Sequence, residues 1–152
     1  EERRTITLAS SLHDIGKIGI SEDILGKHGR LTPEERRIMQ THTVLGEQIL
    51  NSLERFRDEE LVRIAAQVCR SHHERYDGGG YPDGLVGEQI PISAQVVSLA
   101  DTYDALISAR PYRDGLTHDE AIRRICSGEC GVFNPLLLGC LRDIEGCLRE
   151  AQ

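Results

Sequence analysis

Residues 70–84 of the chain read RSHHERYDGGGYPDG, and the rest of the sequence can be interpreted outward from this stretch. Its two adjacent histidines, His72 and His73, stand at the end of an apolar run, and a glycine-rich loop follows them. Adjacent imidazoles make poor core material, and Gly-Gly-Gly-Tyr-Pro suits neither a helix nor a strand. The stretch therefore indicates a place where the protein holds a ligand or docks a partner.

Helical signals lie on both sides of this loop. Thr-Pro-Glu-Glu at 32–35 and Thr-His-Asp-Glu at 117–120 each combine an N-cap with a capping-box glutamate, and Asn-Pro at 134–135 is another helix start. Helical spacing of apolar residues predicts helices over 2–15, 32–49, 58–73, 93–108, 117–128 and from 134 onward, with a loop over 77–91. We therefore expect one compact all-α domain over residues 1–152, with about six helices and one long loop.

The expected core is aliphatic, because hydrophobic residues make up 39% of the chain, aromatic residues only 4%, and tryptophan is absent. Helical spacing predicts that apolar residues of the helix after Thr32, and others of the last helix, face inward. These residues are Ile38, Leu45 and Ile49, and Leu137, Leu141, Ile144 and Leu148. The five cysteines are odd in number and form no CxxC pair, so we expect them to be reduced core residues.

Charge and hydropathy exclude some classes of function. The net charge of -7 argues against a nucleic-acid duplex as the main partner, since such binding rests on a basic surface. No apolar run reaches the length of about 18 residues that a membrane span needs, and no secretory signal opens the sequence. Together with the reduced cysteines, these features predict a cytoplasmic protein.

Several polar residues occupy positions that the helical pattern assigns to the interior: His13, Asp14, His42, His72, His73, Asp101 and Asp104. A single histidine on an apolar stripe is usually a hydrogen-bonded core residue, but this number of histidines and aspartates favours a divalent metal site. A shared aspartate could bridge two ions and support phosphoryl chemistry. We expect His28 and His118 to be exposed to solvent, and Lys17 either reaches a bound anion or extends into water.

Three motifs carry a resemblance to a known family. They are HDIGK at 13–17, HHERYDGGGYPDGL at 72–85 and ADTYDALISARPYR at 100–113, and KHGRLTPEE at 27–35 fits the same pattern. With them the chain resembles the HD-GYP phosphodiesterases of the HD superfamily of metal-dependent phosphohydrolases. The resemblance extends to the FNP at 133–135, where the family usually has FDP; asparagine is as good an N-cap as aspartate.

The resemblance implies an HD-superfamily helical fold and two divalent metal ions. Iron or manganese are the first candidates for these ions, and zinc or nickel are the alternatives. It implies that the metal ligands are His13, Asp14, His42, His72, His73 and Asp101, with Asp14 as the bridging carboxylate. The residues around the substrate would be Lys17, Gly80, Tyr81, Arg110 and Arg113. Asp14, Lys17 and Asp104 would act in catalysis, with Asp104 behind the ligands or as a base.

The function that the resemblance implies is hydrolysis of cyclic di-GMP, to linear pGpG or to GMP, in bacterial second-messenger signalling. A mixed cyclic dinucleotide is an open alternative substrate. The alternative function is a catalytically inactive sensor of the dinucleotide or a protein-interaction module. A third candidate function is that of a simpler nucleotide phosphohydrolase of the HD superfamily. The loop with Gly80-Tyr81-Pro82, called the GYP loop below, argues against it, because the simpler enzymes lack that element.

Family members usually carry a further glutamate and histidine on a helix upstream of the HD pair, and no histidine precedes His13 here. This favours the sensor alternative or a fragment of a longer signalling protein that lacks its first helix or helices. In the second case we expect a receiver or sensor domain upstream, as in a response regulator. A GGDEF-type protein partner and a homodimer are further expectations.

Overall fold

The computed structural model describes residues 2–109 and 114–150, and within them the chain is all-α, as predicted. The α-helices are α1 (Glu2–Ser10), α2 (Glu22–Leu25), α3 (Pro33–Gln40), α4 (His42–Asn51), α5 (Glu60–Ser71), α6 (Ile92–Ile107), α7 (His118–Cys126), α8 (Pro135–Asp143) and α9 (Glu145–Glu150). Three short 3₁₀ helices, η1 (Ile15–Gly19), η2 (Glu54–Phe56) and η3 (Gly87–Gln89), complete the described elements. None of these helices is both long enough and apolar enough to cross a membrane.

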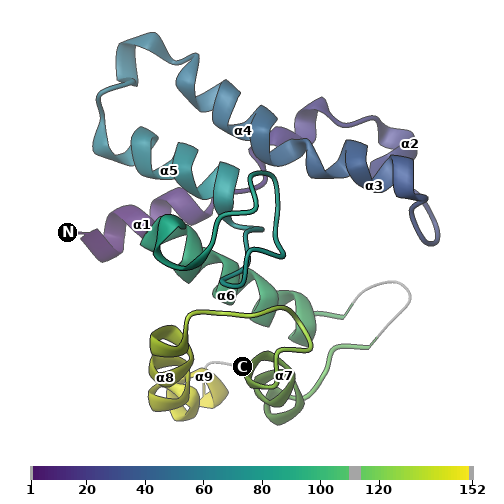
Figure 1. The fold of residues 1–152 in the computed structure, drawn as a ribbon, viewed down its shortest axis with the longest axis vertical. Helices are drawn as coiled ribbons and strands as arrows, with labels where there is room; N and C mark the ends of the chain where they lie inside the picture. The colour runs from purple at the N-terminus through teal and green to yellow at the C-terminus, as the bar shows by residue number, and fades with distance from the viewer. Residues whose placement is uncertain (1, 110–113, 151–152) are drawn as a thin grey trace.

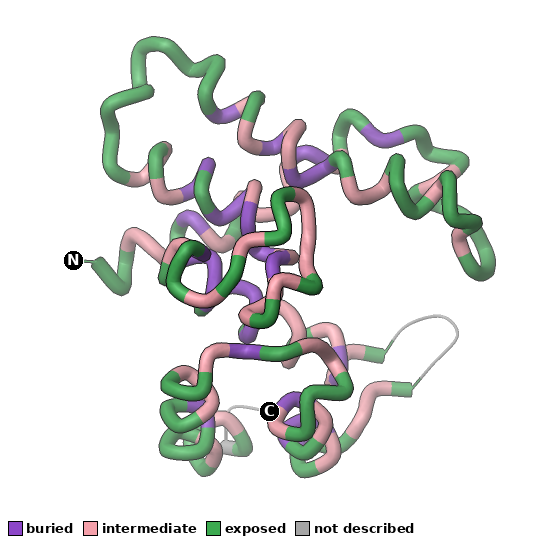
Figure 2. Tube along the Cα trace, in the orientation of Figure 1, coloured by how far each residue is buried: buried purple, intermediate pink, exposed green. Residues whose placement is uncertain are grey.

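Helix α6 connects two groups of helices (Figure 1). Helices α1, α4 and α5 form the upper group, which η1 joins at α4, and α7, α8 and α9 form the lower group. The loop that follows His73 runs in front of α6, and α2 and α3 extend to one side of the upper group. In Figure 2 the buried segments gather where α4, α5 and α6 meet, whereas α2 and α3 are largely exposed.

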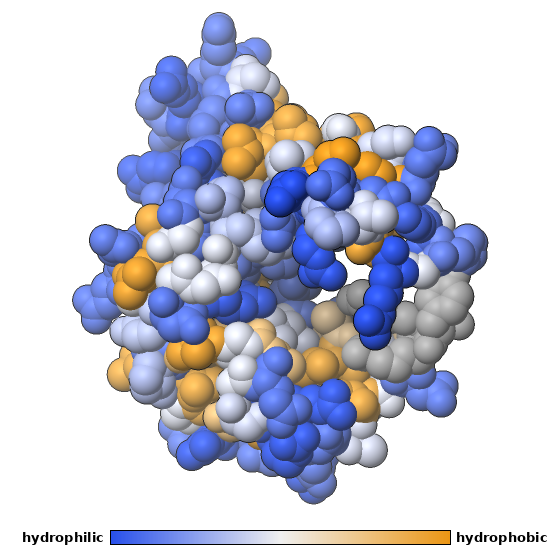
Figure 3. Space-filling model, turned by 45° about the vertical axis from the view of Figure 1, so that its right-hand side comes forward, coloured by the Kyte–Doolittle hydropathy of each residue, from blue (hydrophilic) through white to orange (hydrophobic). Residues whose placement is uncertain are grey.

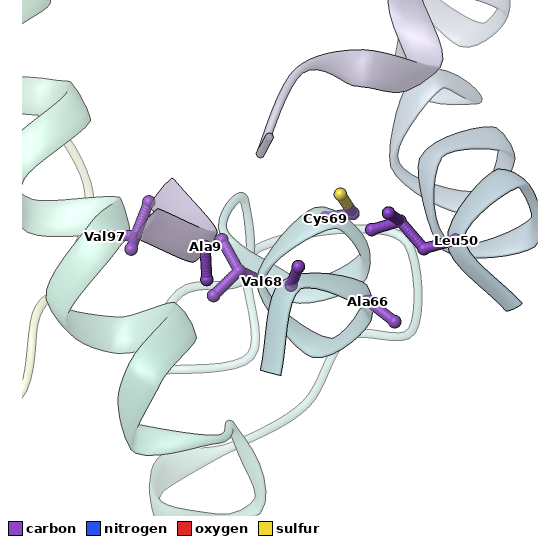
Figure 4. Packing of buried hydrophobic residues seen from close by; sticks show 7 residues of the cluster. Ala9, Leu50, Ala66, Val68, Cys69 and Val97 are labelled. Atoms are coloured by element: carbon purple, nitrogen blue, oxygen red, sulfur yellow. The ribbon is translucent and has the colours of Figure 1, made fainter. Parts of the chain in front are cut away.

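The core is divided in the same way. The upper cluster contains Ala9, Leu50, Ala65, Ala66, Val68, Cys69 and Val97, six of which are labelled in Figure 4. The lower cluster contains Leu99, Leu106, Ala121, Ile122, Ile125, Phe133 and Leu141. Helix α6 contributes Val97 to the upper cluster and Leu99 and Leu106 to the lower one, so both cores fix its position. The aliphatic character of these clusters agrees with the composition.

The helix count of about six is too low, because two predicted helices are broken and α2 was not predicted. The helix from Pro33 stops at Gln40 and a new one begins at His42, where the hydroxyl of Thr41 donates to the carbonyl of Ile38 at 2.7 Å. The last helix breaks at Ile144. Ile38 and Ile144 were predicted to face inward because one apolar stripe was extended across each break. This was wrong for both residues, since Ile38 is 47% exposed and Ile144 is 49% exposed.

The first helix also ends earlier than predicted, at Ser10 rather than at residue 15. The hydroxyls of Ser10 and Ser11 donate to the carbonyls of Thr7 and Leu8, at 2.8 and 2.7 Å. Such local hydrogen bonds compete with helix continuation. The consequence is that His13 and Asp14 lie in a turn between α1 and η1 and not on a helix.

The cysteines are free, as predicted, but not all of them are core residues. Cys69 is buried in the upper cluster, whereas Cys140 and Cys147 are exposed. Cys140 borders an apolar pocket between α6 and α8, and Cys147 lies on α9.

Gly16 allows η1 to lie directly against the start of α4. A Cβ atom on Gly16 would stand 1.9 Å from the carbonyl oxygen of His42 and 2.5 Å from the backbone nitrogen of Gly46. Both obstacles are backbone atoms, so rotation of a side chain cannot relieve the clash. This close approach holds the turn with His13 and Asp14 beside His42.

We expect Gly16→Ala to lower the free energy of unfolding by about 1–3 kcal/mol or more, because η1 must move away from α4. Gly139→Ala is the matched control, since no atom lies within 4 Å of the added methyl group. In exposed α8 the control should be neutral or stabilising by about 0.5–1 kcal/mol. Urea unfolding of both variants measures the difference, and equal stability would contradict the close approach.

Candidate metal centre

The structure brings all six predicted metal ligands together, and it takes them from helix ends and from one helix middle. His13 and Asp14 lie in the turn after α1, and His42 is the first residue of α4. His72 and His73 follow the last residue of α5, and Asp101 lies midway along α6. Helix ends can place side chains at a common point while the helix bodies pack the core.

Asp14 stands at the centre of this group, and its two carboxylate oxygens face different partners. Oδ1 lies 3.3 Å from Nε2 of His42 and 3.9 Å from Nε2 of His72. Oδ2 lies 3.3 Å from Nε2 of His13 and 2.5 Å from Nζ of Lys17. On the other side of His13, its Nε2 is 3.7 Å from Oδ1 of Asp101.

Backbone carbonyls orient three of the imidazoles. Nδ1 of His13 lies 2.7 Å from the carbonyl oxygen of Ser10, and Nδ1 of His42 lies 2.7 Å from that of Met39. Nδ1 of His72 lies 2.9 Å from the carbonyl oxygen of Val68. A carbonyl only accepts, so each Nδ1 carries the proton and donates it. In the neutral rings this leaves the Nε2 lone pairs free to act as ligands, the arrangement that supports metal-binding histidines.

The pKa shifts separate His13 from the other histidines. Burial lowers the pKa of His42, and lowers that of His72 to about 4 and that of His73 to about 3. Hydrogen bonds to Asp101 and Asp14 raise the pKa of His13 to about 10, although burial opposes them. In the absence of an ion, three of the imidazoles are thus neutral, the form that binds metal, and His13 holds a proton between two carboxylates.

The carboxylates remain ionised. Burial would raise the pKa of Asp14, but hydrogen bonds from His13 and Lys17 bring it below its usual value. The hydrogen bond with His13 likewise lowers the pKa of Asp101. The site therefore offers anionic oxygen and neutral nitrogen ligands together.

These donors fit divalent metal ions. Two groups have ligand atoms within 4.8 Å of one another, His42–His72–His73 and His13–Asp14–His72. Oδ1 of Asp14 is buried and has no hydrogen-bond partner among the described residues. A buried carboxylate oxygen without a partner is costly, and a cation between it and the imidazoles would relieve that cost. Nitrogen and hard oxygen ligands together suit iron, manganese or zinc, and the donor set does not select one of them.

His118 corrects the expectation that this residue is exposed. It is only 6% exposed, and its Nδ1 lies 2.7 Å from the hydroxyl oxygen of Tyr103. Its Nε2 is 3.7 Å from a carboxylate oxygen of Glu145, and Asp119 completes a third group of close ligand atoms. Arg149 already contacts the carboxylates of Asp119 and Glu145, so an ion there would meet a bound guanidinium. His28, by contrast, is exposed as predicted.

Glu74 holds the GYP loop against the histidines. Its side chain is only 3% exposed and accepts hydrogen bonds from the backbone N–H groups of Asp83, Gly84 and Leu85, at 2.7, 3.2 and 3.0 Å. The Tyr81 ring stacks on His73 with 4.8 Å between ring centroids. A Cβ on Gly80 would stand 2.3 Å from the backbone nitrogen of Arg75, so this glycine lets the loop fold back on itself.

The loop therefore has a structural role that the sequence did not reveal. The substrate contacts predicted for Gly80 and Tyr81 stay a prediction, and the structure adds that Tyr81 packs on His73 and that Gly80 lies against the backbone of Glu74 and Arg75. The place of Glu74 directly after the two histidines was the available signal for its role, because a carboxylate there can reach the turn that follows.

A pocket of about 420 Å³ opens beside the ligands, lined by Asp14, Lys17, His73, Arg75, Asp101, Thr102, Ala105 and Leu106. The space-filling view in Figure 3 shows a hollow between the upper and lower parts of the molecule, with hydrophilic side chains along its upper edge. The sequence prediction named Lys17 here but assigned no role to Arg75 or Thr102. Arg110 and Arg113, two predicted substrate residues, lie outside the described residues.

Asp104 lies in a different place from this pocket. It is exposed, and with Ser10, His13, Val97, Ala100 and Asp101 it lines a separate pocket of about 220 Å³. Asp104 thus lies one helical turn after Asp101 and lines the pocket that contains His13, not the one that contains Lys17.

Comparison with known proteins agrees with this geometry. The HD domain family matches residues 1–130. The chain is 44% identical over 135 residues to the cyclic di-GMP phosphodiesterase response regulator RpfG of Xanthomonas campestris. The matched region covers 89% of this chain and 35% of RpfG. The chain is 42% identical over 140 residues to a cyclic di-GMP phosphodiesterase of Thermotoga maritima, covering 92% of this chain and 37% of the relative.

A 3'3'-cGAMP-specific phosphodiesterase 2 of Vibrio cholerae is 42% identical over 143 residues, covering 93% of this chain and 26% of the relative. The chain therefore spans between about a quarter and somewhat over a third of the length of these three relatives. The family match covers both motifs that form the site, HDIGK and HHERYDGGGYPDGL. The chain belongs to the HD domain family, and within it to the HD-GYP type.

Proposed function

We propose that the protein is a metal-dependent phosphodiesterase that hydrolyses cyclic di-GMP. The observation that carries the proposal is the position of Asp14. Its carboxylate lies between His42 and His72 on one side and His13 on the other, and it borders a pocket that Lys17 also lines. The names of the relatives support cyclic di-GMP as the substrate. The close approach of the six predicted metal ligands supports an enzyme over an inactive sensor.

The proposed ligands are His42, His72 and His73 for one ion and His13, Asp14 and Asp101 for the other, with Asp14 shared between them. Divalent ions in such a site neutralise a phosphodiester and make water more acidic. The backbone carbonyls that fix His13, His42 and His72 keep their Nε2 atoms directed at the carboxylate of Asp14, so the site needs little reorganisation.

Lys17 would bind the substrate phosphate. Its ammonium group stands 2.5 Å from Oδ2 of Asp14, and its side chain is 41% exposed, so it can reach a non-bridging oxygen without leaving the pocket. Charge-assisted hydrogen bonds of this kind are stronger than neutral ones. We assign Asp104 a supporting position behind Asp101, because both line the second pocket with His13.

Further parts of the proposal rest on chemistry or on the relatives alone. The product is linear pGpG, GMP or both, and a mixed cyclic dinucleotide is a second candidate substrate because one relative is named for 3'3'-cGAMP. Iron or manganese are the first metals to test. The longer relatives support a receiver or sensor domain upstream, and we place the activity in the cytoplasm, with a homodimer or a GGDEF-type partner as further proposals.

The first test is hydrolysis of cyclic di-GMP by the full-length protein with Mn²⁺ or Fe²⁺, followed by chromatographic separation of pGpG from GMP. Asp14→Asn should reduce metal content per chain and lower turnover by about a hundredfold or more, because it removes the shared anionic ligand. Elemental analysis and initial rates measure the two effects.

Asp58→Asn is the matched control for this test, because Asp58 is exposed and lies away from the site. It should retain both metal and turnover. Normal turnover by Asp14→Asn with a normal metal content would contradict the proposed mechanism. Parallel tests with 3'3'-cGAMP decide between the two candidate substrates.

Metal binding should release a proton from His13. Its pKa of about 10 keeps the ring protonated at pH 7.5, whereas His72 and His73, at about 4 and about 3, are already neutral. Binding at Nε2 removes that proton, so we expect release of about one proton and an apparent affinity that rises from pH 7 towards pH 9.

Titration calorimetry of the metal-free protein in two buffers of different ionisation enthalpy measures this number directly. His13→Asn should remove most of the proton release while the remaining imidazoles still bind an ion. Metal binding by the unaltered protein without any proton release would show that His13 is not a ligand.

A further inference from the structure

We propose that Arg75 binds a phosphate oxygen of the dinucleotide, as the second cation of the pocket that holds Lys17. This inference rests on the proposed function and deepens it, because it adds a substrate-binding residue that neither the sequence motifs nor the proposed function assigned. The pocket brings Arg75 to the same cavity as the carboxylates of Asp14 and Asp101 and the ring of His73.

Arg75 is a half-buried guanidinium with neutral acceptors only. Its Nη1 donates to the hydroxyl of Ser98 at 2.7 Å and to the carbonyl oxygen of Glu74 at 3.1 Å. No carboxylate of the described residues lies within ion-pair distance, and the side chain of Glu74 is occupied by the GYP loop. The N–H groups of Nη2 have no described partner, so a donor pair remains available to an anion.

Arg70, an arginine near the same loop, has carboxylate partners instead. Arg70 pairs with Glu47 and Asp83, and these carboxylates raise its pKa. Arg75 has neutral partners instead, the hydroxyl of Ser98 and the carbonyl oxygen of Glu74. A half-buried cation without a counter-ion is costly, and a phosphate in the pocket would supply the missing charge.

The position of Arg75 is also built by the chain around it. Its guanidinium carbon stands 5.3 Å from the centroid of the Phe133 ring, a cation–π contact. Gly131 has φ +103°, and a Cβ there would lie 2.4 Å from Nε of Arg75. The backbone N–H of Tyr76 donates to the carbonyl oxygen of Val132 at 2.9 Å and ties the same segments together.

These contacts give the Gly-Glu-Cys-Gly turn at 128–131 a role. Only glycine at 131 combines a positive φ with room for the stem of Arg75. The turn lies against the stem of Arg75, Phe133 and Ser98 contact its guanidinium, and the residue also lines the pocket. Such pre-organisation is typical of a residue that receives a ligand.

The test uses the metal-loaded protein, with cyclic di-GMP as substrate and inorganic phosphate as a competitive probe. Arg75→Met removes the charge and keeps the length of the side chain. We expect KM to rise about ten- to a hundredfold, and inhibition by phosphate to weaken, while metal content and the unfolding midpoint stay unchanged. Arg75→Lys should recover part of the loss, because it restores the charge.

Arg63→Met is the matched control, because Arg63 is exposed on α5, and it should leave KM and phosphate inhibition unchanged. Ser98→Ala tests positioning: it frees the guanidinium and should raise KM a few-fold. Unchanged KM and phosphate inhibition in folded, metal-loaded Arg75→Met would overturn the proposal. If Arg75→Met does not fold, unchanged values in both Arg75→Lys and Ser98→Ala would overturn it instead.

Failure of the proposed function is a separate outcome. If the unaltered protein hydrolyses neither cyclic di-GMP nor 3'3'-cGAMP, calorimetric binding of cyclic di-GMP to the metal-loaded protein replaces KM. Weaker binding by Arg75→Met then supports the role of Arg75 without turnover. Equal binding, or no binding by the unaltered protein, overturns it.

Discussion

Oδ1 of Asp14 is a buried carboxylate oxygen that no described group hydrogen-bonds, although imidazole nitrogens lie 3.3 and 3.9 Å away. Proteins seldom bury an ionised oxygen without compensation. The surrounding structure maintains this position: each of three imidazoles is turned towards Asp14 by a carbonyl on its far side. A cation in the centre would satisfy the oxygen and the nitrogens together, so the local geometry fits the proposed metal site.

The two cores make this arrangement possible at a distance from the site. Helix α6 is held by the upper cluster through Val97 and by the lower one through Leu99 and Leu106, and Asp101 lies between these contacts. Gly16 brings η1 within backbone contact of His42. The contacts of α6 set the position of the Asp101 carboxylate, and the contact of Gly16 sets that of Asp14. The position of the site is thus a consequence of helix packing, whereas its orientation is set by local hydrogen bonds.

The sequence predicted those features that depend on local chemistry. The caps at Thr32, Thr117 and Asn134 are present, and all six candidate ligands come together. The breaks at Thr41 and Ile144 were missed, because periodicity continues across them and only the three-dimensional path reveals the change. His118 was missed for a related reason: the first turn of a capped helix is usually exposed, but Tyr103 of α6 covers this one. Asp104 shares the spacing of the ligands, yet it faces another pocket, since spacing alone does not say which side of a neighbouring histidine a residue will reach.

The charge of the whole chain is a poor guide to what the pocket can bind. The chain is acidic, with a net charge of -7, and its proposed substrate is an anion. The carboxylates that line the pocket, Asp14 and Asp101, would be neutralised by the ions they hold, so their negative charge does not oppose a phosphate. The charges that would then remain are the ammonium of Lys17, hydrogen-bonded to Asp14, and the guanidinium of Arg75, hydrogen-bonded to Ser98. An acidic protein can therefore present a positive cavity, because the field that a buried ligand meets comes from the few charges beside it and only weakly from the solvated surface.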